Sequence, residues 1–212
     1  MSSSAHPIAA RWPRLIQRLV GDANHSTTKA LADLEAAYAD PPRAYHNLNH
    51  IAECLDLLDQ IHADHDPSIE LAIWYHDAIY DPFSKSNEQD AADFMRRAAT
   101  DLGVAADVIE SAARLILITA NHHQASAPDE QIIADIDLSI LASPAPAYDR
   151  YARAIREEYE EVDEPTYRLA RKAFLSSLLD PPSIFHTPWA HTNNYDQRAK
   201  ANITQELATL TS

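Results

Sequence analysis

Apolar residues recur along most of the chain at steps of three and four, the spacing that gathers them on one face of an α-helix. Residues 47–63 show this pattern clearly, because Ile51, Cys54, Leu55 and Leu58 fall on one stripe. No stretch carries a convincing alternation of apolar and polar residues, which a half-buried strand requires. The pattern therefore predicts an all-α fold.

Prolines, glycines and capping residues divide this pattern into nine or ten predicted helices. Their expected ranges are 8–20, 26–39, 47–63, 67–80, 86–103, 104–122, 132–141, 148–162, 163–179 and 195–210. Residues 180–194 are rich in Pro, Asn and His and predict a loop. Since this loop lies too near the end of the chain to divide two domains, we expect one domain over residues 1–212.

Composition narrows the function classes. Gly21 and Gly103 are the only glycines in 212 residues, which excludes Gly-rich phosphate loops and disfavours hairpin-rich β folds. The net charge of −15 argues against stable nucleic-acid binding, because such binding needs Lys and Arg to neutralise phosphates. The acidic run at 157–161 is expected to form a solvated face.

Cys54 is the only cysteine, so neither an intrachain disulfide nor a thiolate zinc site is expected. The N-terminal residues lack the cationic start and apolar run of a signal peptide, and no apolar stretch approaches the length of a membrane span. We therefore expect a cytoplasmic protein with no membrane partner. The sequence leaves its oligomeric state open.

Histidines are numerous, at eleven, and they cluster. Three clusters stand out: YHNLNH at 45–50, WYHD at 74–77, and NHH at 121–123 together with DID at 135–137. Without a useful cysteine, a metal ion would be bound by imidazole and carboxylate groups, a ligand set that suits Zn, Mn, Fe or Ni.

Three of these polar positions fall in apolar helical stretches. His50 faces the apolar stripe of its helix, and the His76-Asp77 pair lies late in an apolar helix, where adjacent side chains diverge by about 100°. Asp137 also lies among apolar residues, and burial of its carboxylate is costly unless it is paired or metal-bound. With 17 Lys and Arg against 32 Asp and Glu, basic partners are scarce. The pattern therefore predicts that these groups bind a metal ion.

This arrangement resembles the HD superfamily of metal-dependent phosphohydrolases, whose signature is a His, a His-Asp pair and a distant Asp. The match falls on His50, His76-Asp77 and Asp137. The YHN stretch that leads to His50 and the DLS stretch that starts at Asp137 are similar to motifs of the cyclic-nucleotide phosphodiesterase branch. That branch has a longer spacing than the 26 residues between the two histidines, and its nucleotide-clamping glutamine has no counterpart here.

From about residue 10 to the end, the chain resembles a bacterial family described as predicted HD-type metal-dependent phosphohydrolases. The stretches WYHD, DIDLSIL and IREEY carry this resemblance. It implies an HD-type helical bundle and one or two divalent ions, with Mn, Ni, Co, Zn, Fe and Mg all open. The resemblance to the phosphodiesterase branch implies that His46 acts as a proton donor, and Asp77 could bridge to a second ion through its other oxygen.

Asp135 competes with Asp137 for the last ligand position. On a helix the two side chains face about 200° apart, so both cannot bind one ion. The match to the DLS motif favours Asp137.

Further residues are candidates for substrate binding. Arg43 could anchor an anion before the first motif, and Lys85 and Glu88 could hold a phosphate and a water after the second. His122 and His123 could face the site from the end of their helix. For all five, the alternative is an ordinary surface, capping or packing role.

The resemblance implies hydrolysis of a small phosphorylated substrate, a nucleotide-like phosphoester or phosphoanhydride, by a metal-activated water. Two alternatives stay open. An HD-type di-iron oxygenase would use additional His ligands, which His122 or His123 could supply. A metal-binding or ligand-binding module would share the fold without catalysis.

Overall fold

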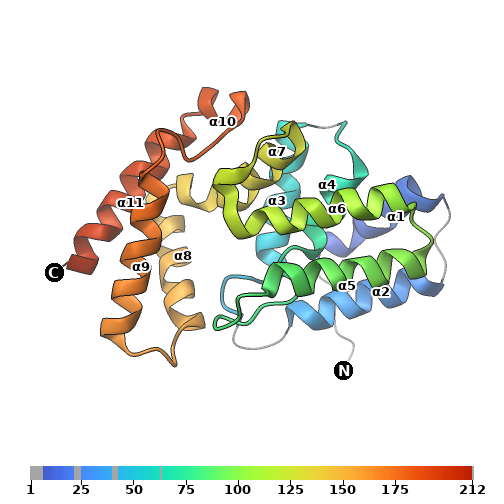
Figure 1. The fold of residues 1–212 in the computed structure, drawn as a ribbon, viewed down its shortest axis with the longest axis horizontal. Helices are drawn as coiled ribbons and strands as arrows, with labels where there is room; N and C mark the ends of the chain where they lie inside the picture. The colour runs from blue at the N-terminus through green and yellow to red at the C-terminus, as the bar shows by residue number, and fades with distance from the viewer. Residues whose placement is uncertain (1–6, 22–24, 40–42, 63, 212) are drawn as a thin grey trace. The chain divides into compact units, whose positions relative to one another are not determined.

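A computed structural model describes residues 7–21, 25–39, 43–62 and 64–211, and within these ranges the chain is helical with no strand (Figure 1). The prediction of an all-α fold is confirmed. These ranges contain eleven α-helices, one more than the upper expectation. None of them is long and apolar enough to cross a membrane.

The chain forms two compact units, Met1–Ala120 and Asn121–Ser212. The expectation of a single domain over 1–212 stays a prediction. The first unit contains the short 3-10 helix η1 (Pro7–Ala10) and the helices α1 (Trp12–Val20), α2 (His25–Tyr38), α3 (Leu48–Ile61), α4 (Pro67–Tyr75), α5 (Asn87–Leu102) and α6 (Ala106–Ile118).

Helix α4 is the core of the first unit. All of its residues from Ser68 to Tyr75 are buried, and it packs against α1, α3, α5 and α6. A helix that is apolar on every side is stable only when it is enclosed in this way. Its N-terminus is fixed by Asp66, whose side chain accepts a hydrogen bond of 2.8 Å from the Ser68 backbone, and by Pro67 in the first turn.

The second unit has its own core. It contains the helices α7 (Pro128–Asp137), α8 (Ala145–Glu158), α9 (Glu164–Leu179), α10 (Pro188–Thr192) and α11 (Tyr195–Thr211), with the 3-10 helix η3 (Leu138–Ala142) between α7 and α8. Helix α11 packs against η3, α9 and α10, and Figure 1 shows α9 and α11 side by side. The 3-10 segment η2 (Thr119–Gln124) spans the boundary between the units.

Several predicted boundaries were wrong. The helix expected over 104–122 stops at Ile118, and Asn121 leaves the helical region with φ −153° and ψ 83°. The loop expected over 180–194 contains α10, because Thr187 caps its first turn and Pro188 follows at the first helical position. Residue 63, the expected end of the third helix, lies outside the described residues.

Asp135 anchors the segment before α10. Its buried carboxylate accepts hydrogen bonds from the His186 backbone (2.7 Å), from the Thr187 backbone (2.8 Å) and from the Thr187 hydroxyl (2.7 Å). Burial raises the pKa of Asp135 above its usual value, although these hydrogen bonds oppose the shift. The carboxylate is thus occupied in holding the second unit together.

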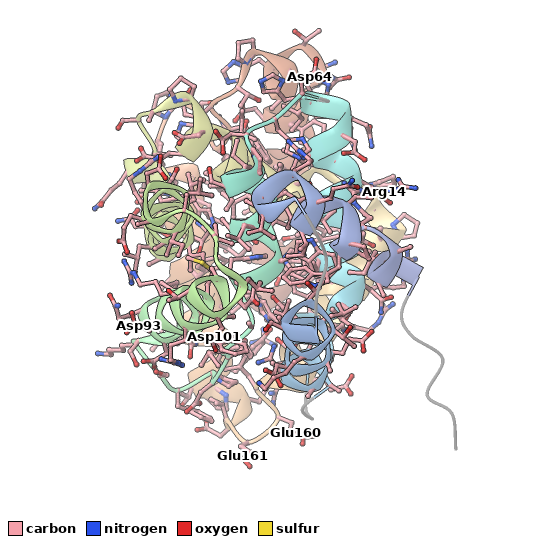
Figure 2. The ribbon with its side chains drawn as sticks, turned by 90° about the vertical axis from the view of Figure 1, so that its right-hand side faces the viewer. Arg14, Asp64, Asp93, Asp101, Glu160 and Glu161 are labelled. Atoms are coloured by element: carbon pink, nitrogen blue, oxygen red, sulfur yellow. The ribbon has the colours of Figure 1, made fainter. Side chains whose placement is uncertain are left out.

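Charged side chains project from the outside of each unit. Figure 2 labels Asp93 and Asp101 on α5 of the first unit, and Glu160 and Glu161 after α8 of the second. The acidic run at 157–161 is solvated at three of its four glutamates, but Glu158 is buried on the inner side of α8.

Asp66→Ala should lower the free energy of unfolding by about 1 kcal/mol at neutral pH, because α4 loses its cap. The Ser68 hydrogen bonds lower the pKa of Asp66, so the cap contributes above the unfolded-state pKa and is lost as the pH falls through the folded-state value. Denaturant unfolding at pH 7 and at pH 2.5 checks this. The difference in the free energy of unfolding between variant and wild type should be smaller at pH 2.5 than at pH 7. An equal difference at both pH values would contradict the capping role.

Asp135→Ala should lower the free energy of unfolding by about 2–4 kcal/mol, because three donors lose their acceptor in a buried position. Thr187→Val removes one of the three donors and should cost about 1 kcal/mol. Thermal unfolding followed by circular dichroism measures both variants. Equal stability of Asp135→Ala and wild type would show that this carboxylate does not anchor the segment.

Candidate metal centre

The His76-Asp77 pair lies at the point where α4 ends. The helix stops at Tyr75, His76 caps it in a helical conformation, and a turn follows in which the Ala78 backbone donates to the Tyr75 carbonyl at 2.9 Å. The expectation that both side chains diverge along a continuing helix is therefore wrong. Because the helix has ended, the Asp77 carboxylate comes within 3.0 Å of Nε2 of His76.

His50 lies in the first turn of α3, which Asn47 caps through a hydrogen bond of 2.9 Å from the Asn49 backbone. Its ring is buried with the apolar stripe of that helix. Nε2 of His50 lies 3.2 Å from Nε2 of His76 and 3.4 Å from Oδ2 of Asp77. The structure thus brings together three residues that the sequence selected as metal ligands.

The three ligand atoms have the spacing that one ion imposes. Bonds of about 2.1 Å keep neighbouring ligand atoms about 3.0 Å apart in octahedral geometry and about 3.4 Å apart in tetrahedral geometry. The separations among His50, His76 and Asp77 are 3.0, 3.2 and 3.4 Å. This group of two imidazoles and one carboxylate could therefore hold a metal ion.

The protonation pattern of His76 also suits a ligand. Its Nδ1 lies 2.9 Å from the Ile73 carbonyl and can only donate to that oxygen. In the neutral ring this leaves the lone pair on Nε2, on the side of His50 and Asp77. A backbone carbonyl that orients an imidazole in this way is the usual outer partner of a metal-binding histidine.

Oδ2 of Asp77 is buried without a partner of hydrogen-bond geometry, although both imidazoles lie close to it. Burial alone raises the pKa of Asp77. The charges of His76 and His46 and the close contacts with His50 and His76 lower it further than burial raises it, so the pKa lies well below its usual value. A buried carboxylate that stays ionised needs a cation or strong donors beside it.

His46 lies next to this group. Its ring stacks on Tyr80 with a centroid distance of 4.2 Å and lies 6.2 Å from the ring of His50. The guanidinium of Arg43 donates to the His46 carbonyl at 3.3 Å. The half-buried His46 ring is therefore held beside the candidate ligand His50, and its role as a proton donor stays a prediction.

Lys85 lies in the connection between α4 and α5, and Glu88 follows it in α5. Two hydrogen bonds tie the middle of this connection to the start of α5: the Asp81 backbone donates to the Asn87 side chain (3.0 Å), and the Asn87 side chain donates to the Asp81 carbonyl (2.8 Å). The Lys85 side chain is exposed, and Glu88 is half-buried in the first turn of α5. Their roles in substrate binding stay predictions.

The second unit contains the other predicted groups. Nε2 of His122 lies 2.7 Å from Oδ2 of Asp137, so His122 is ordered by this pair rather than simply solvated. The ring of His186 contacts the His122 carbonyl at 3.1 Å. Partial burial and the charges of His122 and His186 lower the pKa of His123, which lies on the outer side of this group.

Sequence reasoning missed His186. The signal was present in the His-rich segment 180–194, but a loop residue far along the chain gives no spacing from which to place it. The ties from this segment to Asp135 bring His186 next to His122 within the second unit.

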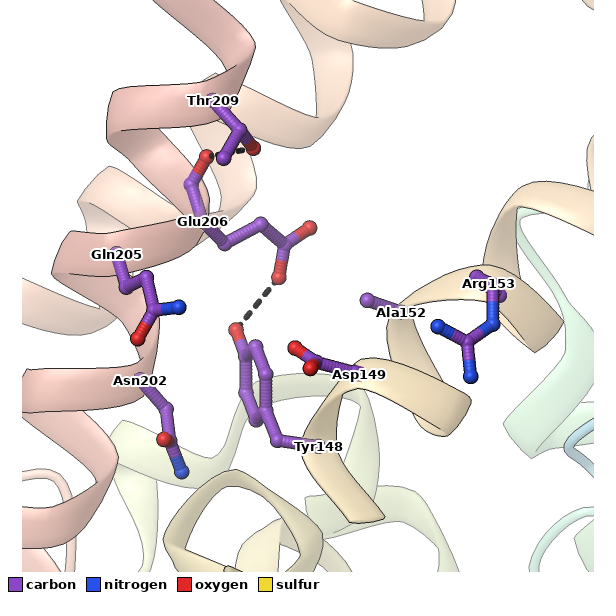
Figure 3. A pocket seen from close by; sticks show the side chains of 8 residues that line it. All are labelled: Tyr148, Asp149, Ala152, Arg153, Asn202, Gln205, Glu206 and Thr209. Atoms are coloured by element: carbon purple, nitrogen blue, oxygen red, sulfur yellow. Dashed lines mark hydrogen bonds between the residues drawn. The ribbon is translucent and has the colours of Figure 1, made fainter. Parts of the chain in front are cut away.

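A cavity of about 210 Å³ lies between α8 and α11, and none of the predicted site residues lines it. Figure 3 shows the hydrogen bond of 2.6 Å from the Tyr148 hydroxyl to Glu206. Arg171 also donates to the Glu206 carboxylate, at 2.8 and 3.2 Å. Burial and the contact with Glu206 raise the pKa of Tyr148 well above its usual value. These partners satisfy one another, which is typical of a structural network.

Ser183, His191 and Asp196 also lie together in the second unit, but they do not form a nucleophilic triad. The Ser183 hydroxyl lies 2.7 Å from Asp196 and 3.2 Å from Nε2 of His191. In a triad the carboxylate orients the histidine from its other ring nitrogen. Here Asp196 instead accepts from the Ile184 backbone at 2.7 Å, so the group locks a turn.

Comparison with known proteins gives no assignment for this centre. No family model, no curated protein and no solved structure matches the chain. The geometry of His50, His76 and Asp77 and the motifs around them are therefore the basis for assigning a function.

Proposed function

We propose that this chain is a metal-dependent phosphohydrolase that cleaves a small phosphorylated, nucleotide-like substrate. Its ion would be bound by His50, His76 and Asp77 of the first unit, with Asp137 of the second unit as the fourth ligand. The observation that carries the proposal is the spacing of the first three ligand atoms, all within 3.0–3.4 Å of one another.

Two observations support Asp137 as the fourth ligand. It starts the DLS stretch, which resembles the motif around the last metal ligand of the phosphodiesterase branch. Within its own unit it is oriented by His122, and metal-binding carboxylates are commonly fixed by such a partner. The competing carboxylate of Asp135 is already used by His186 and Thr187.

A bound divalent ion would lower the pKa of a coordinated water toward neutrality and would offset the charge of a phosphoryl group. Asp77 would hold the ion and, through its second oxygen, could hold another. His46, held by Tyr80 beside His50, would protonate the leaving oxygen. Lys85 would contribute a mobile positive charge at the edge of the site.

The charge balance of the chain agrees with this proposal. A phosphorylated substrate is repelled by a protein of net charge −15 unless a local cation reverses the field. A divalent ion is the largest local charge in such a site and attracts the phosphate.

One feature favours a second candidate, an HD-type di-iron oxygenase. Two imidazoles and one carboxylate are also the donor set of mononuclear non-haem iron oxygenases, so the residues of the first unit would accept iron as one of the two ions. His122 and His186 would then be available near Asp137 for a second iron. Iron content together with substrate-dependent oxygen consumption would select this candidate over the hydrolase.

Asp77→Asn should weaken metal binding by more than about 100-fold, because loss of outer partners alone costs about 10–100-fold and Asp77 is a direct ligand. Asp137→Asn should also weaken metal binding. Titration calorimetry of metal-stripped protein with Mn²⁺ and Co²⁺, with elemental analysis of the purified protein, measures both effects.

The matched control is Asp135→Asn, which alters a buried carboxylate two residues from Asp137. It should lower the melting temperature and leave metal affinity within about threefold of wild type, as expected for a residue outside the coordination sphere. If Asp135→Asn releases the ion and Asp137→Asn does not, the assignment of the fourth ligand is wrong. If wild type binds no divalent ion, the whole proposal fails.

His46→Gln should lower kcat by about 10²–10⁴-fold, the usual contribution of general acid catalysis, while the protein keeps its metal. The measurement is a panel of phosphomonoesters, phosphodiesters and nucleotides assayed with Mn²⁺, Co²⁺, Ni²⁺ and Mg²⁺. The alkaline limb of the pH–rate profile, along which a general acid loses its proton, should change with the substitution. Metal binding with no turnover across the panel would favour a binding module without catalysis.

A further inference from the structure

Arg43 is committed to the backbone around the candidate centre. Its Nη1 donates to the Asp77 carbonyl at 2.7 Å and to the His46 carbonyl at 3.3 Å, and its Nη2 donates to the Ala78 carbonyl at 3.0 Å. One guanidinium therefore joins the segment that carries His46 to the turn that carries Asp77.

The two carbonyls after α4 need such a donor. They lie in the turn beyond the last residue of α4, outside the helical hydrogen-bond pattern, and a buried backbone carbonyl is costly without a donor. Ala78 is buried, and Asp77 is largely so. By donating to both carbonyls, Arg43 fixes the backbone conformation from which the Asp77 side chain projects.

Aromatic rings hold the guanidinium in place. Its central carbon lies 5.4 Å from the ring centroid of Tyr38 and 5.8 Å from that of Tyr80, within the range of a cation–π contact. The Tyr38 hydroxyl donates to the Trp74 carbonyl near the end of α4 at 3.0 Å. Tyr80 stacks on His46, so the rings connect the end of α4 with the proposed proton donor.

We infer that Arg43 is a positioning residue, which sets the distance between the proposed acid His46 and the metal ligand Asp77. This inference rests on the proposed metal site and gives Arg43 a different role from that of a substrate anchor. A planar guanidinium with donors in a fixed fork is needed to reach three carbonyls. A lysine, with one nitrogen on a flexible stem, cannot reproduce these contacts.

The test is Arg43→Lys in the full-length protein, with Co²⁺ as the probe. The affinity of the protein for Co²⁺ should fall by about 10-fold or more, as it does when other outer partners of metal ligands are lost. The visible absorption spectrum of bound Co²⁺ should also change. Binding of inorganic phosphate to the Co²⁺-loaded protein should then be no weaker than in wild type at equal Co²⁺ occupancy.

Arg156→Lys is a matched control. Arg156 also donates to two backbone carbonyls, those of Tyr159 and Val162, and it lies 4.7 Å from the ring of Tyr167. It lies in the last turn of α8 in the second unit, and its two acceptor carbonyls lie between α8 and α9, where there is no proposed ligand. This substitution should lower stability and leave Co²⁺ affinity and the Co²⁺ spectrum unchanged.

The outcomes separate the two proposals. If wild type binds no Co²⁺, the proposed function fails and this inference fails with it. If wild type binds Co²⁺ and Arg43→Lys binds it equally with the same spectrum, only the role of Arg43 is overturned. Unchanged Co²⁺ affinity with weaker phosphate binding would likewise overturn it, in favour of a substrate anchor.

A second variant covers the case in which Arg43→Lys does not fold. Tyr80→Leu removes the ring that stacks on His46 and flanks the guanidinium, while it leaves every hydrogen-bond donor of Arg43 in place. It should weaken Co²⁺ binding by about 3–10-fold through the same outer contacts. Wild-type Co²⁺ affinity and spectrum in this variant would contradict the inference.

Discussion

Two imidazole nitrogens and one carboxylate oxygen converge in a buried position of the first unit, and this convergence is the constraint on which the functional argument depends. Nε2 of His76 faces the other two groups with its lone pair, because Nδ1 is occupied by the Ile73 carbonyl. Oδ2 of Asp77 has no hydrogen-bond partner. Polar atoms crowded in this way are unfavourable unless protons or a cation fill the space between them. A divalent ion bound between these atoms would remove the unfavourable contacts.

The fold creates this convergence by enclosing one short helix and ending it at the right residue. Helix α4 is surrounded by its neighbours, so its position is fixed by packing rather than by its own surface. The helix then stops at Tyr75, and the turn that follows lets two consecutive side chains face one ion. Arg43 donates to the Asp77 and Ala78 carbonyls of this turn. The turn from which the Asp77 side chain projects is thus supported by an arginine that acts through backbone carbonyls rather than through the candidate ligand atoms.

Sequence reasoning could select His50, His76 and Asp77 because polar residues in apolar helical stretches are conspicuous against a periodic pattern. Sequence reasoning could not find the end of α4, because Tyr75 and His76 carry no capping signal. The Asp-Pro pair at 81–82 instead predicted that the helix ends at Tyr80, five residues later than it does. It could not assign Asp135 either. That carboxylate and Asp137 look alike in sequence, and only the contacts with His186 and Thr187, about 50 residues away, show that one of them is already occupied. Long-range hydrogen bonds of this kind leave no local pattern.

The use of arginine in this chain bears on how a phosphorylated substrate would be recognised. Arg43 and Arg156 donate to backbone carbonyls, Arg171 pairs with Glu206, and Arg96 pairs with Glu110. These guanidinium groups are engaged in holding the fold, and each would lose its present partners by turning to a ligand. In a chain with 17 basic and 32 acidic residues, the proposed metal ion would then be the main positive charge that a phosphate meets, with Lys85 as a proposed mobile charge. Under this proposal, binding of a phosphate depends on binding of a metal ion by His50, His76 and Asp77.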